Sequence, residues 1–501
     1  MKTICVPGLK ARTCLSLLGI VLAVALPASA QTTLVQISSD NLTNSDSDHK
    51  TEVEPDTFAW GNTIVSAFHV ARRPGTVGWG SGDIGWATST DGGTTWHHGD
   101  LPGLTVNYKK GTYGAAADPA VAYDAKHGQW LISTLPLAGL SCCSAIGDVA
   151  VSRSTNGLAW GNPILIDKTH LDDKNWTVCD NTATSPFYGN CYTEWDQAFG
   201  SGDVLMSVSS DGGKTWGPGL ASADHAGGLG GEPVVQPNGT VIVPFEDGGI
   251  DVFSSTNGGK SWGSSQVIAS ITSHGVAAGL RNPNLPSASI DGAGNVYVVW
   301  SDCRFRTNCP SNDIVMSTSS NGTTWSGVTR IPIDSTSSGV DHFIPGIGVD
   351  PATSGNTAHI TIVYYYYPKA NCTISTCQLD VGFTTSTDGG ATWTAGAKIA
   401  GPMNVGWLPN SDNGPMVADY IGVSYVNSKP FGVFAVAHKL VGTTYSESMY
   451  TTKTPLPVDL SAPVFSSADD KPVPNAKSDH EVKFFYDDAG HREIPRSRWI
   501  Q

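Results

Sequence analysis

Acidic residues recur along this chain at positions where they could transfer protons. Asp56, Asp118 and Glu232 each lie at the start of a short apolar run that is typical of a β-strand, and Glu246 ends another such run. Only 15% of the residues are charged, so the recurrence is informative. Because two carboxyl groups on opposite sides of a bond can act as general acid and general base, we expect Asp118 to act together with Glu232 or Glu246.

Basic and aromatic side chains occur at matching positions, at either end of the predicted strands. The candidates for substrate binding are Arg72, Lys174, Arg281, Arg304 and His342. A guanidinium or ammonium group binds an anionic part of a ligand through charge-assisted hydrogen bonds. Tyr367 ends another predicted strand and is a candidate nucleophile, since a neighbouring base can activate a phenol.

An eight-residue pattern separates these positions and indicates the elements that hold them. The full copies are Ser89–Trp96, Ser209–Trp216 and Ser386–Trp393, and looser copies end at Trp160, Trp262 and Trp325. The Asp or Asn in each copy can accept hydrogen bonds from the backbone that follows, and the Gly supplies a positive φ. Recurrence of one turn along a chain indicates a repeat architecture.

Each copy joins the third and fourth strands of a predicted four-stranded antiparallel unit. A seventh unit, over residues 417–453, has neither the pattern nor a fourth strand, and the strand-like segment 32–38 could supply that strand. We therefore expect an all-β propeller of seven four-stranded blades over residues 31–455, closed by the N-terminal strand. Six blades are the alternative, if the last unit is a cap. The repeated turns mark the bottom face, so the charged residues above belong to the opposite rim.

The two ends of the chain differ from the repeats. In residues 1–30, basic residues precede an apolar run from Leu15 to Leu26, and Ala28-Ser29-Ala30 could be a cleavage site. This order is typical of a secretory signal peptide, so we expect an extracellular or periplasmic protein without a membrane span. Residues 456–501 are rich in Pro and charged residues, which predicts an irregular or partly disordered tail.

Cysteine usage agrees with export, because eight cysteines remain after the predicted signal peptide. Short separations favour the disulfides Cys179–Cys191, Cys303–Cys309 and Cys372–Cys377. Cys142 and Cys143 could bond to each other or stay reduced. No Cys-x-x-Cys pattern is present, so a metal site built from cysteines is the weaker interpretation.

Charge limits the partners that the chain could have. The formal net charge is −15 and the repeats contain no basic stripe, which argues against nucleic acid or an anionic membrane as partner. We expect a monomer that needs no organic cofactor. Ca²⁺ is the ion that rim carboxylates could bind, with Asp302 and Asp313, or Glu246 with Asp247 and Asp251, as candidate ligands.

The repeated pattern resembles the Asp-box, or BNR repeat, of sialidases and related β-propellers. Asn295–Asp302 followed by Cys303-Arg304, and Asp419–Gly422 near the end, are similar to segments of secreted bacterial proteins described as sialidase-like. The resemblance spans residues 32–455. It implies that the boxes are structural turns away from the active site and that extracellular glycans are the ligands.

The resemblance implies a first hypothesis, an exo-sialidase-like glycoside hydrolase. Three arginines would hold the carboxylate of the substrate, and the candidates are Arg72, Arg281 and Arg304. Tyr366, Tyr367 or Tyr420 would be the nucleophile, Glu194 or Glu246 its partner, and Asp56 or Asp118 the acid. The chain has Ala71-Arg72-Arg73-Pro74 where this family has Phe/Tyr-Arg-Ile-Pro.

Two other hypotheses remain open. Another carbohydrate-active enzyme could use the same fold, either a hydrolase with Asp118 and Glu232 or Glu246, or a polysaccharide lyase with His342, Tyr367 and Arg281. A non-catalytic propeller that binds carbohydrate or protein is the third, since a fold by itself does not imply catalysis.

Overall fold

The computed structural model consists of β-strands joined by turns and short loops, with three 3-10 turns as its only helical elements among the described residues. It describes residues 32–74, 79–138, 147–198, 200–411, 413–458, 464–466, 470–473, 485–486 and 492–493, all within the unit Thr32–Gln501. The predicted signal peptide, Cys142 and Cys143 lie outside these residues. No helix in the described part is long and apolar enough to cross a membrane.

The first three groups of antiparallel strands share one continuous sheet. They are β2 (Glu52–Trp60), β3 (Thr63–Arg72), β4 (Ser81–Ser89) and β5 (His97–Asp100); β6 (Ala115–Asp124), β7 (Gln129–Leu137), β8 (Gly147–Ser154) and the first part of β9 (Ile164–Cys179); and the end of β9 with β10 (Cys191–Asp196), β11 (Val204–Ser209) and β12 (Leu220–Ala221). The fourth strand of the second group and the first strand of the third group are one continuous strand, β9, which pairs with β8 over its first part and with β10 over its last.

Four separate four-stranded sheets follow. They are β13 (Val234–Val235), β14 (Val241–Glu246), β15 (Gly249–Ser255) and β16 (Gln266–Ser270); β17 (Ser287–Ile290), β18 (Val296–Asp302), β19 (Asp313–Ser319) and β20 (Thr329–Arg330); β21 (Asp341–Val349), β22 (Ile360–Tyr367), β23 (Gln378–Ser386) and β25 (Ala397–Asn404); and β28 (Gly422–Val426), β29 (Lys429–Ala437), β30 (Glu447–Thr452) and β1 (Leu34–Gln36). In the last sheet, β1 pairs antiparallel with β30, the neighbour that was expected for the N-terminal strand.

The remaining elements are short. They are the strand pairs β24 (Thr392–Thr394) with β31 (Val464–Ser466), β26 (Asn410–Ser411) with β27 (Gly414–Pro415), and β32 (Phe485–Tyr486) with β33 (Arg492–Glu493), and the turns η1 (Ala277–Gly279), η2 (Gly355–Thr357) and η3 (Val405–Trp407). Part of the predicted tail therefore contacts the strands. β31 pairs antiparallel with β24, and Asp470 forms an ion pair with Arg330 at 3.1 Å.

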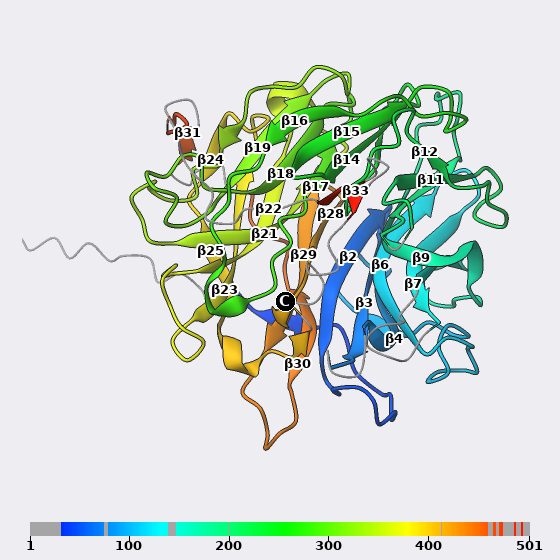
Figure 1. Ribbon diagram of the computed structural model, residues 1–501, viewed down its shortest axis with the longest axis horizontal. Coiled ribbons are helices and arrows are strands. Elements are labelled where there is room, and N and C mark those ends of the chain that lie inside the picture. The colour runs from blue at the N-terminus through cyan, green and yellow to red at the C-terminus, as the bar shows by residue number, and fades with distance from the viewer. Residues whose placement is uncertain are drawn as a thin grey trace, which may run out of the picture. The chain divides into compact units, whose positions relative to one another are not determined.

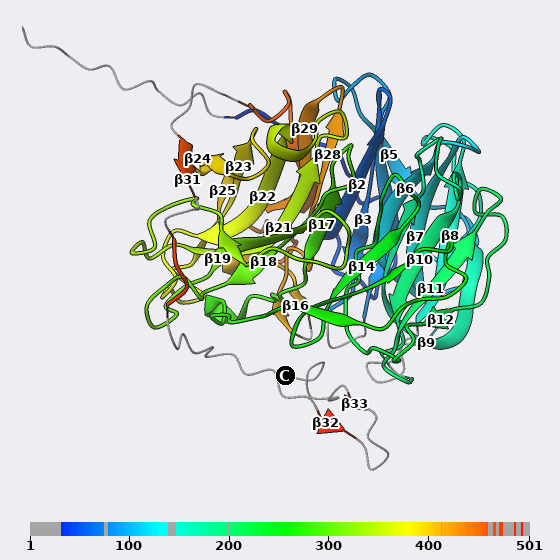
Figure 2. The same cartoon turned by 90° about the horizontal axis from the view of Figure 1, so that it is seen from above.

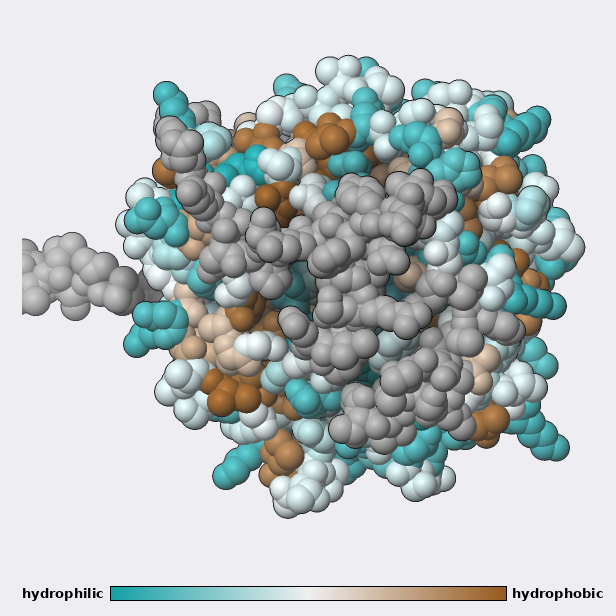
Figure 3. Space-filling view, viewed as in Figure 1, coloured by the Kyte–Doolittle hydropathy of each residue, from teal (hydrophilic) through white to brown (hydrophobic). Residues whose placement is uncertain are grey.

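The strand groups pack face to face, and apolar side chains fill the space between neighbouring groups. Val65 of β3 and Ile132 of β7 share one core cluster, and Val363 of β22 and Val433 of β29 share another. The first group, in blue, lies beside the last, in orange, in both views (Figure 1, Figure 2). The face seen in Figure 3 is mostly polar or of intermediate hydropathy where it is coloured, with hydrophobic residues in small separate groups.

The repeated eight-residue pattern forms one type of turn. In the first copy, Asp91 Oδ1 accepts from the backbone N–H groups of Thr94 and Thr95 at 3.1 and 2.8 Å, and Asp91 Oδ2 accepts from Thr95 Oγ1 at 2.7 Å. Gly93, at a φ of 89°, donates its N–H to Ser89 Oγ. The copies with Asn keep the backbone bonds, as Asn321 does with Thr323 and Thr324. The pattern is therefore a self-contained turn between two strands.

All three predicted disulfides are present. Cys179 and Cys191 face each other on β9 and β10, with Cα atoms 4.0 Å apart. Cys303–Cys309 and Cys372–Cys377 close loops with sequence separations of 6 and 5. Each bond therefore constrains a short segment.

Candidate active site

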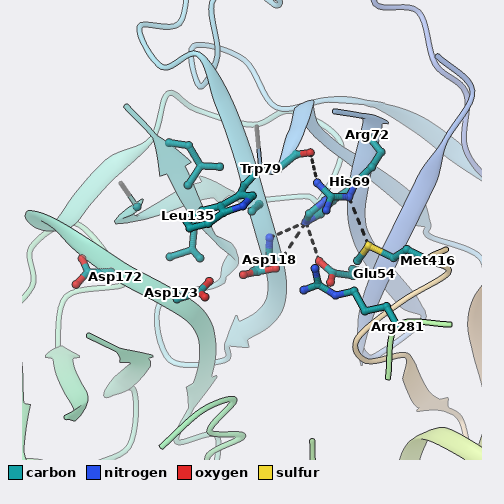
Figure 4. Close-up of a pocket in the computed structure, with 14 residues that line it drawn as sticks. Glu54, His69, Arg72, Trp79, Asp118, Leu135, Asp172, Asp173, Arg281 and Met416 are labelled. Atoms are coloured by element: carbon teal, nitrogen blue, oxygen red, sulfur yellow. Dashed lines mark hydrogen bonds and ion pairs between the residues drawn. The ribbon is translucent and has the colours of Figure 1, made fainter. Parts of the chain in front are cut away.

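A cavity that is open to solvent lies where the inner strands β2, β6 and β9 approach one another. Its ionisable lining residues are Glu54, His69, Arg72, Asp118, Asp172, Asp173 and Arg281. Trp79 forms part of its wall (Figure 4). Acids, bases and an aromatic ring thus share one concave site, as is typical of a ligand or active site.

Local irregularities of the inner strands help to direct the central side chains. Glu54 and Asp118 each precede a proline, have φ values of 55° and 47°, and lie where the pairing register shifts in β2 and β6. Lys174 has a φ of 33° and lies within β9 at a similar register shift, where Asp173 and Asn175 pair with adjacent residues of β10. A β-bulge re-aims a side chain relative to a regular strand. The same device therefore acts in three successive inner strands.

Lys174 is the centre of the charged cluster. Its Nζ lies 2.8 Å from Asp419 Oδ2, 3.3 Å from Asp118 Oδ1 and 3.6 Å from Glu54 Oε1. It also lies 5.1 Å from the ring centroid of Tyr420. Burial alone would lower the pKa of Lys174, but the surrounding carboxylates raise it above its ordinary value. Lys174 therefore stays charged and bridges three strand groups.

Lys174 lowers the pKa of two of its carboxyl partners, Asp118 and Asp419. Burial would raise the pKa of Asp118, but Lys174 and His69 hold it well below its ordinary value. Burial would likewise raise the pKa of Asp419, but Arg281 and Lys174 lower it. Both carboxyl groups are therefore ionised at neutral pH.

His69 connects Glu54 with Asp118. Its Nε2 lies 3.0 Å from Glu54 Oε2, and it lies 2.7 Å from the backbone N of Asp118, which donates to it (Figure 4). Burial raises the pKa of Glu54, with Lys174 opposing this effect. Burial would lower the pKa of His69, but Glu54 and Asp118 raise it. His69 therefore lies between Glu54 and Asp118 beside the cavity.

The pKa of Asp173 is shifted in the opposite direction to that of Asp118. Burial, followed by the negative charge of Asp118, raises the pKa of Asp173 to about 7. One lining carboxyl is thus ionised, and another is about half protonated near pH 7. Two carboxyl groups whose environments separate their pKa values in this way can act as base and acid.

Glu54, His69 and Asp118 could also hold a metal ion, since one ligand atom from each lies within 4.8 Å of the others. The ammonium of Lys174 already lies beside both carboxylates, however, and supplies the positive charge that a cation would bring. A second group, formed by Asp313, Asp334 and His342, contains two carboxylates that Arg306 already pairs with at 2.7 and 3.0 Å.

Four predicted site residues belong to the cavity or its charged cluster: Asp118, Lys174, Arg72 and Arg281. Burial raises the pKa of Glu232, and the charge of Asp56 raises it further. Asp56 itself has its pKa raised to about 7 by burial, and its Oδ2 accepts from the N–H of Val121.

The other predicted residues have partners outside the residues that line the cavity. Arg304 pairs with Asp302 at 2.7 Å and donates to the carbonyl of Ser270. Glu246 Oε1 accepts from the N–H of Gly248. His342 Nδ1 contacts the carbonyl of Asn312 at 3.2 Å, and the buried Tyr367 hydroxyl contacts that of Ala277 at 3.4 Å. The expected Ca²⁺ ligands Asp302 and Asp313 are thus both paired with arginines.

Three residues of the cluster were not among the predicted site residues: Glu54, His69 and Asp419. A sequence signal existed for Glu54, since Glu54-Pro55 matches Asp118-Pro119 in position and composition. His69 and Asp419 follow no such pattern. Their roles depend on contacts between strand groups that are far apart in the chain.

Comparisons with known proteins give only distant similarities. No protein-family model and no curated protein matches the chain. Similar solved structures include a protein of unknown function from Dyadobacter fermentans, with 13% identity, coverage of 85% of this chain and 99% of that one, and a TM-score of 0.43. They also include the intramolecular trans-sialidase of Ruminococcus gnavus (12%, 82% and 97%, 0.41) and the sialidase of Trypanosoma rangeli (12%, 84% and 59%, 0.42). With TM-scores below 0.5, these similarities transfer no residue role to this chain.

Proposed function

We propose that this protein is a secreted Asp-box β-propeller of seven blades that acts on extracellular glycans as a glycoside hydrolase. Seven four-stranded groups can be traced among the described strands, and the pairing of β1 with β30 supports closure by the N-terminal strand. Three disulfides support an oxidising compartment. The active site is the cavity beside Lys174.

The observation that carries the reaction is that one cavity is lined by an ionised Asp118 and by Asp173, whose pKa is raised to about 7. Asp173 donates its proton to the glycosidic oxygen as the bond to the leaving sugar breaks. Asp118 either takes a proton from the attacking water or attacks the anomeric carbon itself. Trp79 provides an aromatic surface for a sugar ring.

The arginines favour a hydrolase other than a sialidase. A sialidase-type clamp needs three guanidinium groups around one carboxylate. Here Arg281 forms a bidentate pair with Asp419, Arg72 donates to the carbonyl of Gly80 at 2.5 Å, and Arg304 pairs with Asp302. The three candidates are thus engaged with three different groups of the protein.

The test is an activity screen with aryl glycosides and soluble polysaccharides, comparing the wild type with Asp118→Asn and Asp173→Asn. Each substitution should lower kcat/KM by at least about 100-fold, since each removes a group that transfers a proton or bonds to the sugar. Asp211→Asn is the matched control: its carboxylate belongs to an exposed turn, and three sister turns carry Asn.

Thermal unfolding of each variant separates lost chemistry from lost folding. Wild-type hydrolysis that survives both substitutions would contradict the assignment of Asp118 and Asp173. Glycan binding without hydrolysis in the wild type would favour the non-catalytic propeller instead. One observation favours that alternative: the ammonium of Lys174 lies 3.3 Å from Asp118 Oδ1 and already pairs with it.

A further inference from the structure

Asp419 is bound by this protein in the manner of a ligand carboxylate. Its Oδ1 accepts from Arg281 Nε at 2.6 Å, and its Oδ2 accepts from Arg281 Nη2 and from Lys174 Nζ, the latter at 2.8 Å. Arginine recognises carboxylate ligands in the same way, because its planar guanidinium group can donate two parallel hydrogen bonds to one carboxylate. The side chain of Asp419 is 1% exposed, so this pair lies behind the cavity surface that Arg281 helps to form.

The other cation of the cavity wall is also engaged. Arg72 is buried, donates through Nη1 to the carbonyl of Gly80 and lies with Nε 3.4 Å from Met416 Sδ. Figure 4 shows Arg72 and Arg281 on the same side of the cavity as Glu54 and His69, with Asp172 and Asp173 across from them. The cavity therefore presents carboxyl groups on both sides, while its guanidinium groups are held by the protein.

We infer that Asp419 is a resident carboxylate that occupies the place a substrate carboxylate would need, so that the cavity accepts sugars without a carboxylate group. This inference rests on the proposed glycoside hydrolase function and specifies its substrate class. A sialic acid or uronic acid would have to compete with Asp419 for Arg281 and Lys174. It would also bring a further negative charge next to Glu54 and Asp118, and like charges repel.

The inference makes a distinctive prediction for the variant Asp419→Ala. Without the resident carboxylate, Arg281 and Lys174 become two adjacent cations with no carboxylate between them. A small carboxylate that can enter, such as formate or acetate, should then bind in the vacated space. A cavity made by truncating an apolar side chain in a protein core would show no such preference for anions.

The experiment measures binding without relying on turnover. Full-length wild type, Asp419→Ala and the control Asp211→Asn are titrated with formate, acetate, N-acetylneuraminic acid, glucuronic acid and the neutral sugars galactose and glucose. Thermal shift and isothermal calorimetry are the readouts, and sodium chloride at equal ionic strength is the control for salt. Asp419→Ala should bind formate at least about 10-fold more tightly than the wild type and regain melting temperature in its presence.

The wild type alone provides a second test, which holds even if Asp419→Ala does not fold. Its affinity for neutral sugars should exceed that for N-acetylneuraminic and glucuronic acids, and sialosides should not be hydrolysed. Tighter binding of either acidic sugar, or hydrolysis of a sialoside, would overturn the inference while leaving a glycoside hydrolase in place. Absence of hydrolysis of every glycan would count against the proposed function, whereas formate rescue of Asp419→Ala would still support the role of Asp419.

Discussion

Replacing Lys174 by methionine would remove the ammonium that three buried carboxyl groups share. Methionine keeps most of the length and apolar volume of the lysine stem, so the change is mainly one of charge. Lys174 is 4% exposed, and its carboxyl partners Asp419, Asp118 and Glu54 are each 5% exposed or less. Removing one partner of a buried ion pair leaves an uncompensated charge and costs about 3–5 kcal/mol. Arg281 and His69 remain, and they limit the loss to this range.

The expected change in melting temperature follows from the size of the protein. An unfolding entropy of about 2.1 cal/mol/K per residue gives roughly 1 kcal/mol/K for a unit of about 470 residues. Lys174→Met should therefore lower Tm by about 3–5 °C near pH 7. Lys398→Met is the matched control, because Lys398 is 41% exposed and pairs with Asp380 at 2.6 Å. Its partner Asp380 is buried, but Lys398 itself faces water, so the loss should stay below that of Lys174→Met.

The pH dependence separates loss of charge from loss of packing. In the wild type, Asp118 has a depressed pKa, so its contribution to stability is present above the unfolded value of about 4 and is lost as pH falls. In Lys174→Met, burial raises the pKa of Asp118, and protonation at lower pH relieves the unpaired charge. The Tm difference from wild type should therefore shrink between pH 7 and pH 4, as measured by calorimetry. A difference that is constant with pH, or no larger than that of Lys398→Met, would refute the reasoning.

Three further predictions concern the reaction, the turns and the disulfides. Hydrolysis should fall as pH rises through about 7, because Asp173 must be protonated to act as the acid and its pKa is raised to about 7; a pH–rate profile flat to pH 9 would contradict this. Asp388→Ala should cost about 1–2 kcal/mol in urea unfolding, since three bonds to its carboxylate are lost, while Asp388→Asn should cost less than half of that. Removal of the disulfide Cys179–Cys191, with its separation of 12, should lower the free energy of unfolding by about 3 kcal/mol. The loss is measured by comparing the unfolding of the wild type with that of Cys179→Ala/Cys191→Ala.

The parts of the fold that sequence could predict are those that depend on neighbouring residues. The Ser, Asp and Gly of each repeated turn bond to one another within five residues, so the pattern itself determines the turn. The disulfides were predictable for the same reason, since each closes a short loop. The continuity of β9 was not predictable, because it depends on pairing with β8 and β10 at its two ends rather than on any residue within it.

The candidate site was predictable only in part. A position at a strand end predicts which end of the strands a residue lies on, but it does not predict whether its side chain points toward the cavity. Asp118 and Lys174 were recognised from their positions at strand starts and do meet in the cluster. Arg304 follows a strand in the same way, yet its guanidinium turns back to Asp302, two residues earlier. Asp419 contacts Lys174 across a separation of 245 residues, and no local pattern encodes a contact of that kind.

The position of the backbone strain supports a functional origin for the charged cluster. Glu54, Asp118 and Lys174 are non-glycine residues with positive φ, a conformation that costs on the order of 1–3 kcal/mol each and persists where the surroundings impose it. Their charges add a further cost, since a buried ion network is often less stabilising than well-packed apolar side chains of similar volume. A fold selected for stability alone would favour regular strands with apolar side chains at these buried positions. In this cluster, positive φ and buried charge occur in the same three residues, and strain of this kind concentrates at functional sites.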